Sequence, residues 1–151
     1  MDKYVLVGGQ KATADFGRDR YEILTEATAL TAADTGKILY LNSTTEFTVT
    51  LPAVADAEAG WNCMIIVSSA PASADYTITE KTADDTDVIV TNGINELEVD
   101  TSDDGPYNAG HTTIKFKDGV AVAGDWIQVR CDGTNYFVTG QTKADGGIAL
   151  A

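Results

Sequence analysis

The sequence predicts an all-β protein, a compact antiparallel β-sandwich or jelly-roll-like barrel with an extended N-terminal arm. Two observations predict this class. Short segments in which apolar and polar residues alternate recur at intervals of ~8–12 residues, a spacing typical of sandwiches and barrels. Asn-Gly and Asp-Gly pairs, which favour tight turns because glycine tolerates positive φ, punctuate these segments. We therefore expect strands joined by turns and no βαβ units.

The chain of 151 residues is long enough for one domain that buries ~70% of its extended surface, and too short for two comfortable cores. Residues 1–28 mix glycines and charges without a sustained period, so we expect an arm there. The sandwich is expected over residues 29–140, and the small residues of 141–151 predict a weakly ordered tail. The apolar run Tyr4–Val7 is too short for a signal peptide, so we expect the chain to be made in the cytoplasm.

The formal net charge of −13 argues against two classes of partner. A chain this acidic repels phosphate backbones and anionic lipid headgroups. We therefore expect it to bind neither nucleic acid nor membranes. The charge is uneven, because the first twenty residues hold four basic and three acidic side chains, a net of +1 that leaves −14 for the rest. The leading segment is thus electrically unlike the body of the chain.

The first half of the predicted sandwich contains three strands. Residues 27–33 support one helical turn at most, and Lys37–Leu41 predicts a strand that ends in the turn 42–45. Phe47–Leu51 alternates, with its three apolar side chains on one face, until Pro52 stops the ladder. After a loop with one helical turn at 54–60, Trp61–Val67 is apolar on both faces, so we expect a central strand that is covered on both sides.

The second half contains shorter strands and a closing hairpin. We expect strands at 76–79, 88–90, 96–99 and 112–117, a turn at Asn92-Gly93 and a loop over 100–110. In the hairpin 124–138, a two-residue turn at Asp132-Gly133 joins two strands that each begin with aromatic residues. Ile127, Val129 and Cys131 alternate there with Gln128 and Arg130.

The residues that could perform chemistry do not form a recognisable set. His111 is the only histidine and no nucleophile motif accompanies it, so we expect a solvated loop histidine. Cys63 and Cys131 lie in strand-like runs and are expected to be buried and reduced, because pairing would need their Cα atoms within ~7 Å. We expect no enzyme activity and no cofactor.

An acidic loop raises the question of calcium. Asp100, Ser102 and Asp104 stand at positions 1, 3 and 5 of a calcium loop, but position 12 is His111 where a bidentate glutamate is required. An EF-hand is therefore excluded. Solvated turn carboxylates are the expectation for this loop and for 84–87, and an irregular cation site stays open as an alternative.

Four aromatic residues allow two interpretations of their role. In a small β-domain with few large side chains they favour the core or an interface, whereas exposed rings could form a sugar-stacking platform. These residues are Trp61, Trp126, Tyr136 and Phe137.

Five turn and strand-edge motifs stand out between about residues 29 and 140: residues 29–37, 49–52, 59–60, 124–126 and 132–136. Together they resemble the β-rich head decoration (capsid cement) proteins of tailed bacteriophages. It implies a homotrimer on the outer surface of a phage head, where each copy bridges neighbouring major capsid protein subunits without an active site. Such a protein is part of the virion and is assembled in the host cytoplasm.

The less acidic arm is our candidate for the capsid contact. We expect it to lie along the capsid and to order on docking, with the apolar run near its start adding a strand to an exposed sheet edge. A disordered lead-in is the alternative reading. The candidate contact residues are Tyr4, Val5, Leu6, Val7, Phe16, Arg18, Arg20 and Tyr21.

A tail-fibre or spike module that binds host-cell surface glycans is the alternative function, and a small hydrolase is a third. Long fibres usually carry repeats or coiled-coil heptads for trimerisation, and this short chain shows neither. This difference favours decoration of the head over a fibre.

Overall fold

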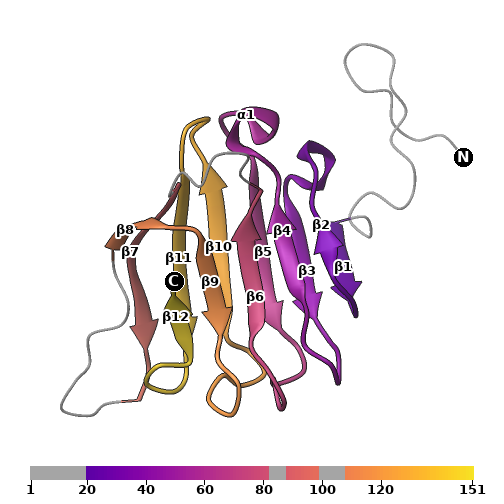
Figure 1. Cartoon of the computed structure of the whole chain (residues 1–151), viewed down its shortest axis with the longest axis vertical. Coiled ribbons are helices and arrows are strands. Elements are labelled where there is room, and N and C mark those ends of the chain that lie inside the picture. The colour runs from indigo at the N-terminus through magenta and orange to yellow at the C-terminus, as the bar shows by residue number, and fades with distance from the viewer. Residues whose placement is uncertain (1–19, 82–87, 99–107) are drawn as a thin grey trace, which may run out of the picture.

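The computed structural model describes residues 20–81, 88–98 and 108–151, and these form two β-sheets packed face to face (Figure 1). The all-β sandwich is thus confirmed. The seven-stranded sheet has the order β1-β3-β5-β10-β11-β7-β8. Its strands are β1 (Tyr21–Leu24), β3 (Lys37–Leu41), β5 (Asn62–Val67), β10 (Trp126–Cys131), β11 (Tyr136–Thr142), β7 (Ile89–Glu96) and β8 (Asn108–His111).

The five-stranded sheet has the order β12-β9-β6-β4-β2. It consists of β12 (Ile148–Leu150), β9 (Thr113–Phe116), β6 (Tyr76–Glu80), β4 (Thr48–Leu51) and β2 (Thr28–Ala29). The helical parts are the 3-10 turn η2 (Ala32–Asp34) and the single turn α1 (Val54–Ala57), which lies at the top of the view in Figure 1. Both turns fall where the sequence allowed one.

Both sheets are mixed, so the antiparallel pairing expected for the sandwich is present in only part of each sheet. From β1 to β6, the chain places successive strands alternately in the seven-stranded and the five-stranded sheet. Each crossing reverses the chain, so strands two apart run the same way. Consequently β1, β3 and β5 pair in parallel, as do β2, β4 and β6. Antiparallel pairing returns where β10 lies between β5 and β11.

The strands extend beyond the expected limits of the sandwich. β1 lies before residue 29, β2 begins at residue 28 and β12 lies after residue 140, because each finds a partner strand at the edge of a sheet. β8 begins within the expected loop 100–110. β7 runs through Asn92-Gly93, where a turn was predicted; Gly93 has a φ of 113°, and the register to β11 shifts between Val138 and Gly140. The glycine therefore marks an irregularity inside one strand.

The closing hairpin is confirmed with a longer loop. Cys131 pairs with Tyr136, so four residues close it where two were predicted. Asp132 explains the difference, because its Oδ1 accepts hydrogen bonds from the backbone N–H groups of Thr134 and Asn135 at 2.8 and 2.7 Å. These two hydrogen bonds, with that from Asn135 the larger, lower the pKa of the Asp132 carboxyl.

The core lies between the sheets and is built by alternate residues. In β5, Cys63, Ile65 and Val67 face inward and are at most 1% exposed, whereas the residues between them are half-buried. The prediction that this strand is covered on both sides is therefore wrong. The five-stranded sheet supplies the opposite wall, with Ile78 and Phe116 among its fully buried side chains.

Gly140 fills a position in this core where no side chain fits. It is the cross-strand partner of Ile127, and a methyl group on it would meet the Trp126 carbonyl oxygen and stand 2.9 Å from the Ile127 Cγ2 atom. Both neighbours belong to a central strand and have little freedom to move.

We expect Gly140→Ala to lower the free energy of unfolding by about 1–3 kcal/mol, because the added methyl overpacks the core. Urea unfolding followed by tryptophan fluorescence measures this. Thr139→Ala is the matched control, since its exposed side chain faces away from the core, and it should change stability by less than about 0.5 kcal/mol. Equal stability of Gly140→Ala and the wild type would contradict this packing.

Asp75 ties the start of β6 to the loop that follows β9. Its carboxylate accepts hydrogen bonds from Lys117 Nζ and from the Asp118 backbone N–H, both at 2.8 Å. Burial opposes ionisation of this carboxyl, but the hydrogen bonds from Lys117 and Asp118 outweigh it and lower the pKa from its ordinary value of 3.8. The contribution to stability is therefore full above that value and is lost as the pH falls through the lowered pKa.

Asp75→Asn should accordingly flatten the fall in unfolding free energy below pH ~4, since the variant has no carboxylate there to protonate. Urea midpoints measured at intervals across the acid range give the slope. The control is Asp145→Asn, because Asp145 is exposed and its carboxylate accepts no hydrogen bond from the described residues. Identical acid slopes for Asp75→Asn and this control would count against the assignment.

Candidate interaction surface

The outer face of the seven-stranded sheet is the most distinctive surface of the described residues. We use the name outer face for the residues of five adjacent strands, β1, β3, β5, β10 and β11, that point away from the core. Cross-strand register places them on one side. They are Tyr21, Ile23, Ile38, Tyr40, Asn62, Met64, Ile66, Trp126, Gln128, Arg130, Phe137, Thr139 and Gln141.

Large apolar side chains run across the outer face in a continuous row. Ile23 pairs with Tyr40, Tyr40 with Ile66 and Ile66 with Trp126, so the row crosses four strands. Tyr21 stands beside it, with its ring 6.4 Å from that of Tyr40 in an edge-to-face arrangement. Cross-strand neighbours at this spacing pack against one another. The row is therefore one apolar surface.

The exposed apolar residues of the molecule concentrate here. Of the large hydrophobic side chains exposed in the described residues, Tyr21 (53%), Ile23 (54%) and Phe137 (43%) belong to the outer face, and Leu97 does not. Full burial of such a side chain stabilises by about 1.5–3 kcal/mol. Five strands ~4.8 Å apart and ~15–20 Å long give a plane area of roughly 400 Å², within the ~300–600 Å² range of the largest, often functional, patches of monomers.

The outer face also lacks carboxylates. The chain has 23 Asp and Glu residues, yet none is among the thirteen residues of the outer face, whose single charge is Arg130. Glu22 and Lys37 belong to the same strands but lie in inward-facing rows, where Lys37 Nζ contacts Glu22 Oε2 at 2.9 Å. The outward residues of the five-stranded sheet carry no carboxylate either, so the outer face is distinguished by its apolar row and not by the lack of acid alone.

The outer side of the five-stranded sheet has a different composition. Its outward residues are threonine, alanine and lysine: Ala29, Thr48, Thr50, Thr77, Thr79, Thr113, Lys115 and Ala149. Threonine combines high β-propensity with a hydroxyl that water can solvate, so this is a solvent face. The contrast between the two sheets singles out the outer face of the larger one as a contact surface.

The four aromatic residues considered in the sequence divide between core and surface. Trp61 and Tyr136 are buried, with ring centroids 5.8 Å apart. The indole Nε1 of Trp61 donates to the Thr31 carbonyl and the Tyr136 hydroxyl donates to that of Pro52. Burial, with smaller effects from nearby acidic groups, raises the pKa of Tyr136. Trp126 and Phe137 lie on the outer face, so only these two could stack on a ligand.

The candidate arm residues fall largely outside the described part of the chain. Tyr4, Val5, Leu6, Val7, Phe16 and Arg18 are all in residues 1–19. Arg20 is exposed, and Tyr21 begins β1 on the outer face. The capsid contact assigned to them stays a prediction. Sequence reasoning selected Tyr21 as part of an arm and missed Tyr40, Met64 and Ile66, because an apolar run such as the one that contains the last two predicts burial on both sides.

The two cysteines are free and buried, as expected. Burial, with a smaller contribution from the Asp34 charge, raises the pKa of the Cys63 thiol to about 12. Burial likewise raises the pKa of Cys131. The thiolate is the reactive form, so neither side chain is a nucleophile near neutral pH.

His111 ends β8 and is half-buried, where the sequence predicted a solvated loop residue. Its Nε2 is enclosed and has no hydrogen-bond partner among the described residues. Within the same residues, no group of three or more His, Cys, Asp and Glu side chains is placed to hold a metal ion. The acidic segments 84–87 and 100–105 lie outside the described residues.

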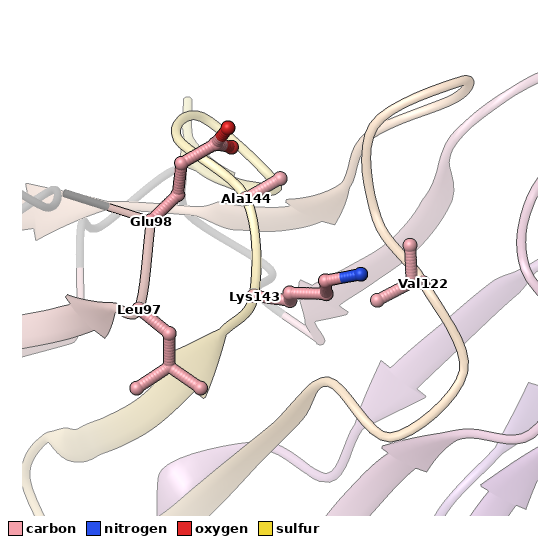
Figure 2. Close-up of a pocket in the computed structure, with 5 residues that line it drawn as sticks. All are labelled: Leu97, Glu98, Val122, Lys143 and Ala144. Atoms are coloured by element: carbon pink, nitrogen blue, oxygen red, sulfur yellow. The ribbon is translucent and has the colours of Figure 1, made fainter. Parts of the chain in front are cut away.

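A shallow pocket of about 520 Å³ lies beside the end of β11, lined by Leu97, Glu98, Val122, Lys143 and Ala144 (Figure 2). Lys143 extends between Leu97 and Val122, whereas the Glu98 carboxylate lies on the side of Ala144. The lining is mainly apolar, and its two charged groups do not converge on one point.

Asp125 lies in a hollow next to this pocket, and its carboxylate is engaged in hydrogen bonds within the fold. Its carboxylate accepts hydrogen bonds from the backbone N–H groups of Val122 and Lys143 and from the Thr142 hydroxyl, all within 3.0 Å. These bonds hold two loops together at the ends of β10 and β11, so this buried acid serves the fold.

No protein-family model, no curated protein and no solved structure matches this chain. Within the described residues, no helix has the length and apolar character that crossing a membrane requires. The surface of the described residues is therefore the feature that bears on function.

Two adjacent isoleucines in β5 test which side of this strand packs into the core and which side lies on the outer face. We expect Ile65→Ala to cost about 2–5 kcal/mol of unfolding free energy, because Ile65 is fully buried between the sheets. Ile66→Ala is the matched control on the outer face and should cost under about 1 kcal/mol at low protein concentration. Urea unfolding of both variants gives the difference. Similar costs would show that the outer face is packed in the single chain.

Proposed function

We propose that this chain is a structural virion protein that binds the outer surface of a phage head and stabilises it by bridging major capsid protein subunits. The observation that carries the proposal is the apolar, carboxylate-free outer face on a chain of net charge −13, a surface suited to protein–protein contact within an assembly, whether with the capsid or between copies of the chain. Depletion of charge and enrichment of aromatic residues are typical of the centres of protein–protein interfaces. The resemblance in turn and strand-edge motifs supports the phage head as the setting and a homotrimer as the assembly.

The mechanism needs binding and no bond chemistry. A protein that binds only the expanded capsid lattice stabilises it by RT ln(1 + [L]/Kd), about 2.7 kcal/mol per site at a concentration 100 times Kd. Linked copies in one oligomer bind neighbouring capsid subunits with an effective concentration that raises the avidity above that of one contact. A rigid sandwich suits this role because little conformational entropy is lost on docking.

The N-terminal residues provide the second contact in this proposal. β1 is the last strand of its sheet and pairs with β3 alone among the described strands, so one of its edges is available for an added strand. The first twenty residues carry a net charge of +1, which reduces the repulsion that the rest of the chain would meet at an acidic partner. Residues 1–20 would therefore reach the capsid from the β1 edge.

Binding to host-cell glycans is the second candidate, and the aromatic residues of the outer face favour it. Tyr21, Tyr40, Trp126 and Phe137 offer ring faces to a sugar if water reaches them. Sugar recognition also needs converging polar groups, for which Gln128 and Gln141 are the nearest candidates on this face. A small hydrolase is the weakest alternative, because Asp125 and both cysteines already serve the core.

Co-sedimentation distinguishes the two leading candidates. We expect the purified chain to bind saturably to expanded, undecorated phage heads and not to host cells, because the proposed contact is with capsid protein. Unexpanded heads are the control and should bind weakly. Saturable binding to cells with none to heads would reverse the ranking of the two functions.

The same assay tests the N-terminal contact. A chain without residues 1–20 keeps the described sandwich and should bind heads at least ~10-fold more weakly if the arm contributes a linked contact. Undiminished binding would discard the arm as a capsid contact and leave the proposed role of the sandwich intact.

A further inference from the structure

We propose that the outer face is the surface by which one copy of this chain binds a second copy. The inference rests on the proposed function for its setting and deepens it, because it assigns a partner to the surface that carries that proposal. Contact with the capsid is then left to the strand edges and the N-terminal residues.

The distribution of charge selects a second copy as the partner. Two chains that each carry −13 repel one another wherever acidic surfaces meet. The outer face has no carboxylate and one arginine, so two copies can approach there without a like-charge contact between acids. A basic partner would instead be attracted by carboxylates on the contact surface, and the outer face offers none.

The polar groups of the outer face are compatible with themselves. Gln128, Thr139 and Gln141 each combine a donor with an acceptor, so each can pair with a polar group of the facing surface on a second copy. A surface of lysines alone or of carboxylates alone could not do this. Gln128 is already oriented, because its Nε2 donates to the Cys63 carbonyl at 3.1 Å and leaves its oxygen available as an acceptor.

The outer face has the size of an interface centre. Its whole plane area, polar positions included, is roughly 400 Å², about half of the ~800 Å² that each partner buries in a standard interface. The row from Ile23 to Trp126 would form the apolar centre, and the half-exposed rings of Tyr21 and Phe137 would add the contacts around it. The threonine side of the other sheet remains in water.

Analytical ultracentrifugation of the full-length chain tests the inference. We expect the wild type to sediment as two or more copies of the 15.9 kDa chain at micromolar concentrations. Ile23→Glu and Phe137→Glu each place a carboxylate on the outer face at a position already exposed to water, so folding should persist. Each should raise the dissociation constant of the assembly at least ~10-fold, because a charge enters an apolar contact.

Two further variants make the result interpretable. Thr139→Glu tests a third exposed position of the outer face and should also favour the monomer. Thr77→Glu is the matched control, since it adds the same charge to the threonine side of the five-stranded sheet, and it should keep the wild-type mass. Far-ultraviolet circular dichroism and the urea midpoint confirm that each variant is folded.

The outcomes separate this inference from the proposed function. A monomeric wild type, or folded Glu variants of the outer face that keep the wild-type mass, would overturn the inference. If such a monomer still bound phage heads, the proposed function would stand without it. If the wild type self-associated through the outer face yet bound no heads, the inference would hold and the proposed function would fail.

Discussion

The alternation of successive strands between two sheets is the constraint on which the rest of this structure depends. Because β1 to β6 cross from one sheet to the other at each step, neighbouring strands within a sheet are contributed by non-consecutive segments and run in parallel. Each strand therefore turns one row of side chains to the shared core and the other row to a different side of the molecule. The core requirement fixes the inner rows and leaves the two outer surfaces free to diverge.

Buried polar groups maintain this arrangement where the chain crosses or turns. The Tyr76 hydroxyl donates to the Ser43 carbonyl and accepts from the Ser43 N–H, which holds the connection between β3 and β4 against β6. Asp125 holds two loops in the same way at the ends of β10 and β11. The Tyr76 hydroxyl and most of the Asp125 carboxylate contacts are thus satisfied by backbone groups, as buried polar groups require.

The sequence predicted which residues share a strand better than it predicted which strands are neighbours. Alternation in Phe47–Leu51 and in the closing hairpin depends on burial of one face, and the structure confirms both. Period-2 alternation does not identify a partner strand, so parallel pairing and the edge strands β1, β2 and β12 were not foreseen. Their two to four residues gain regular structure from the neighbouring strand, and sequence pattern alone has too few positions to reveal this.

The contact surface was hidden from sequence reasoning for a related reason. Trp61–Val67 is apolar at nearly every position, and an apolar run predicts burial on both sides. In the structure its outward residues, Met64 and Ile66, join side chains from strands that are distant along the chain. An apolar face of this kind arises only when the sheet is assembled, so no local segment contains its signature. The signal lies in the excess of apolar residues over what one core can bury.

The distribution of charge explains how an acidic chain can carry such a face without associating non-specifically. A net charge of −13 makes copies repel one another in most orientations, and at ~0.1 M salt this repulsion acts over about 10 Å. The outward sides of both sheets lack acids, so an approach through either brings few like charges together, and of the two only the outer face is apolar. Repulsion elsewhere thus suppresses non-specific association and leaves one orientation in which apolar contact dominates. The acidity of the chain and its apolar outer face therefore act together, because repulsion between acidic surfaces opposes association in other orientations.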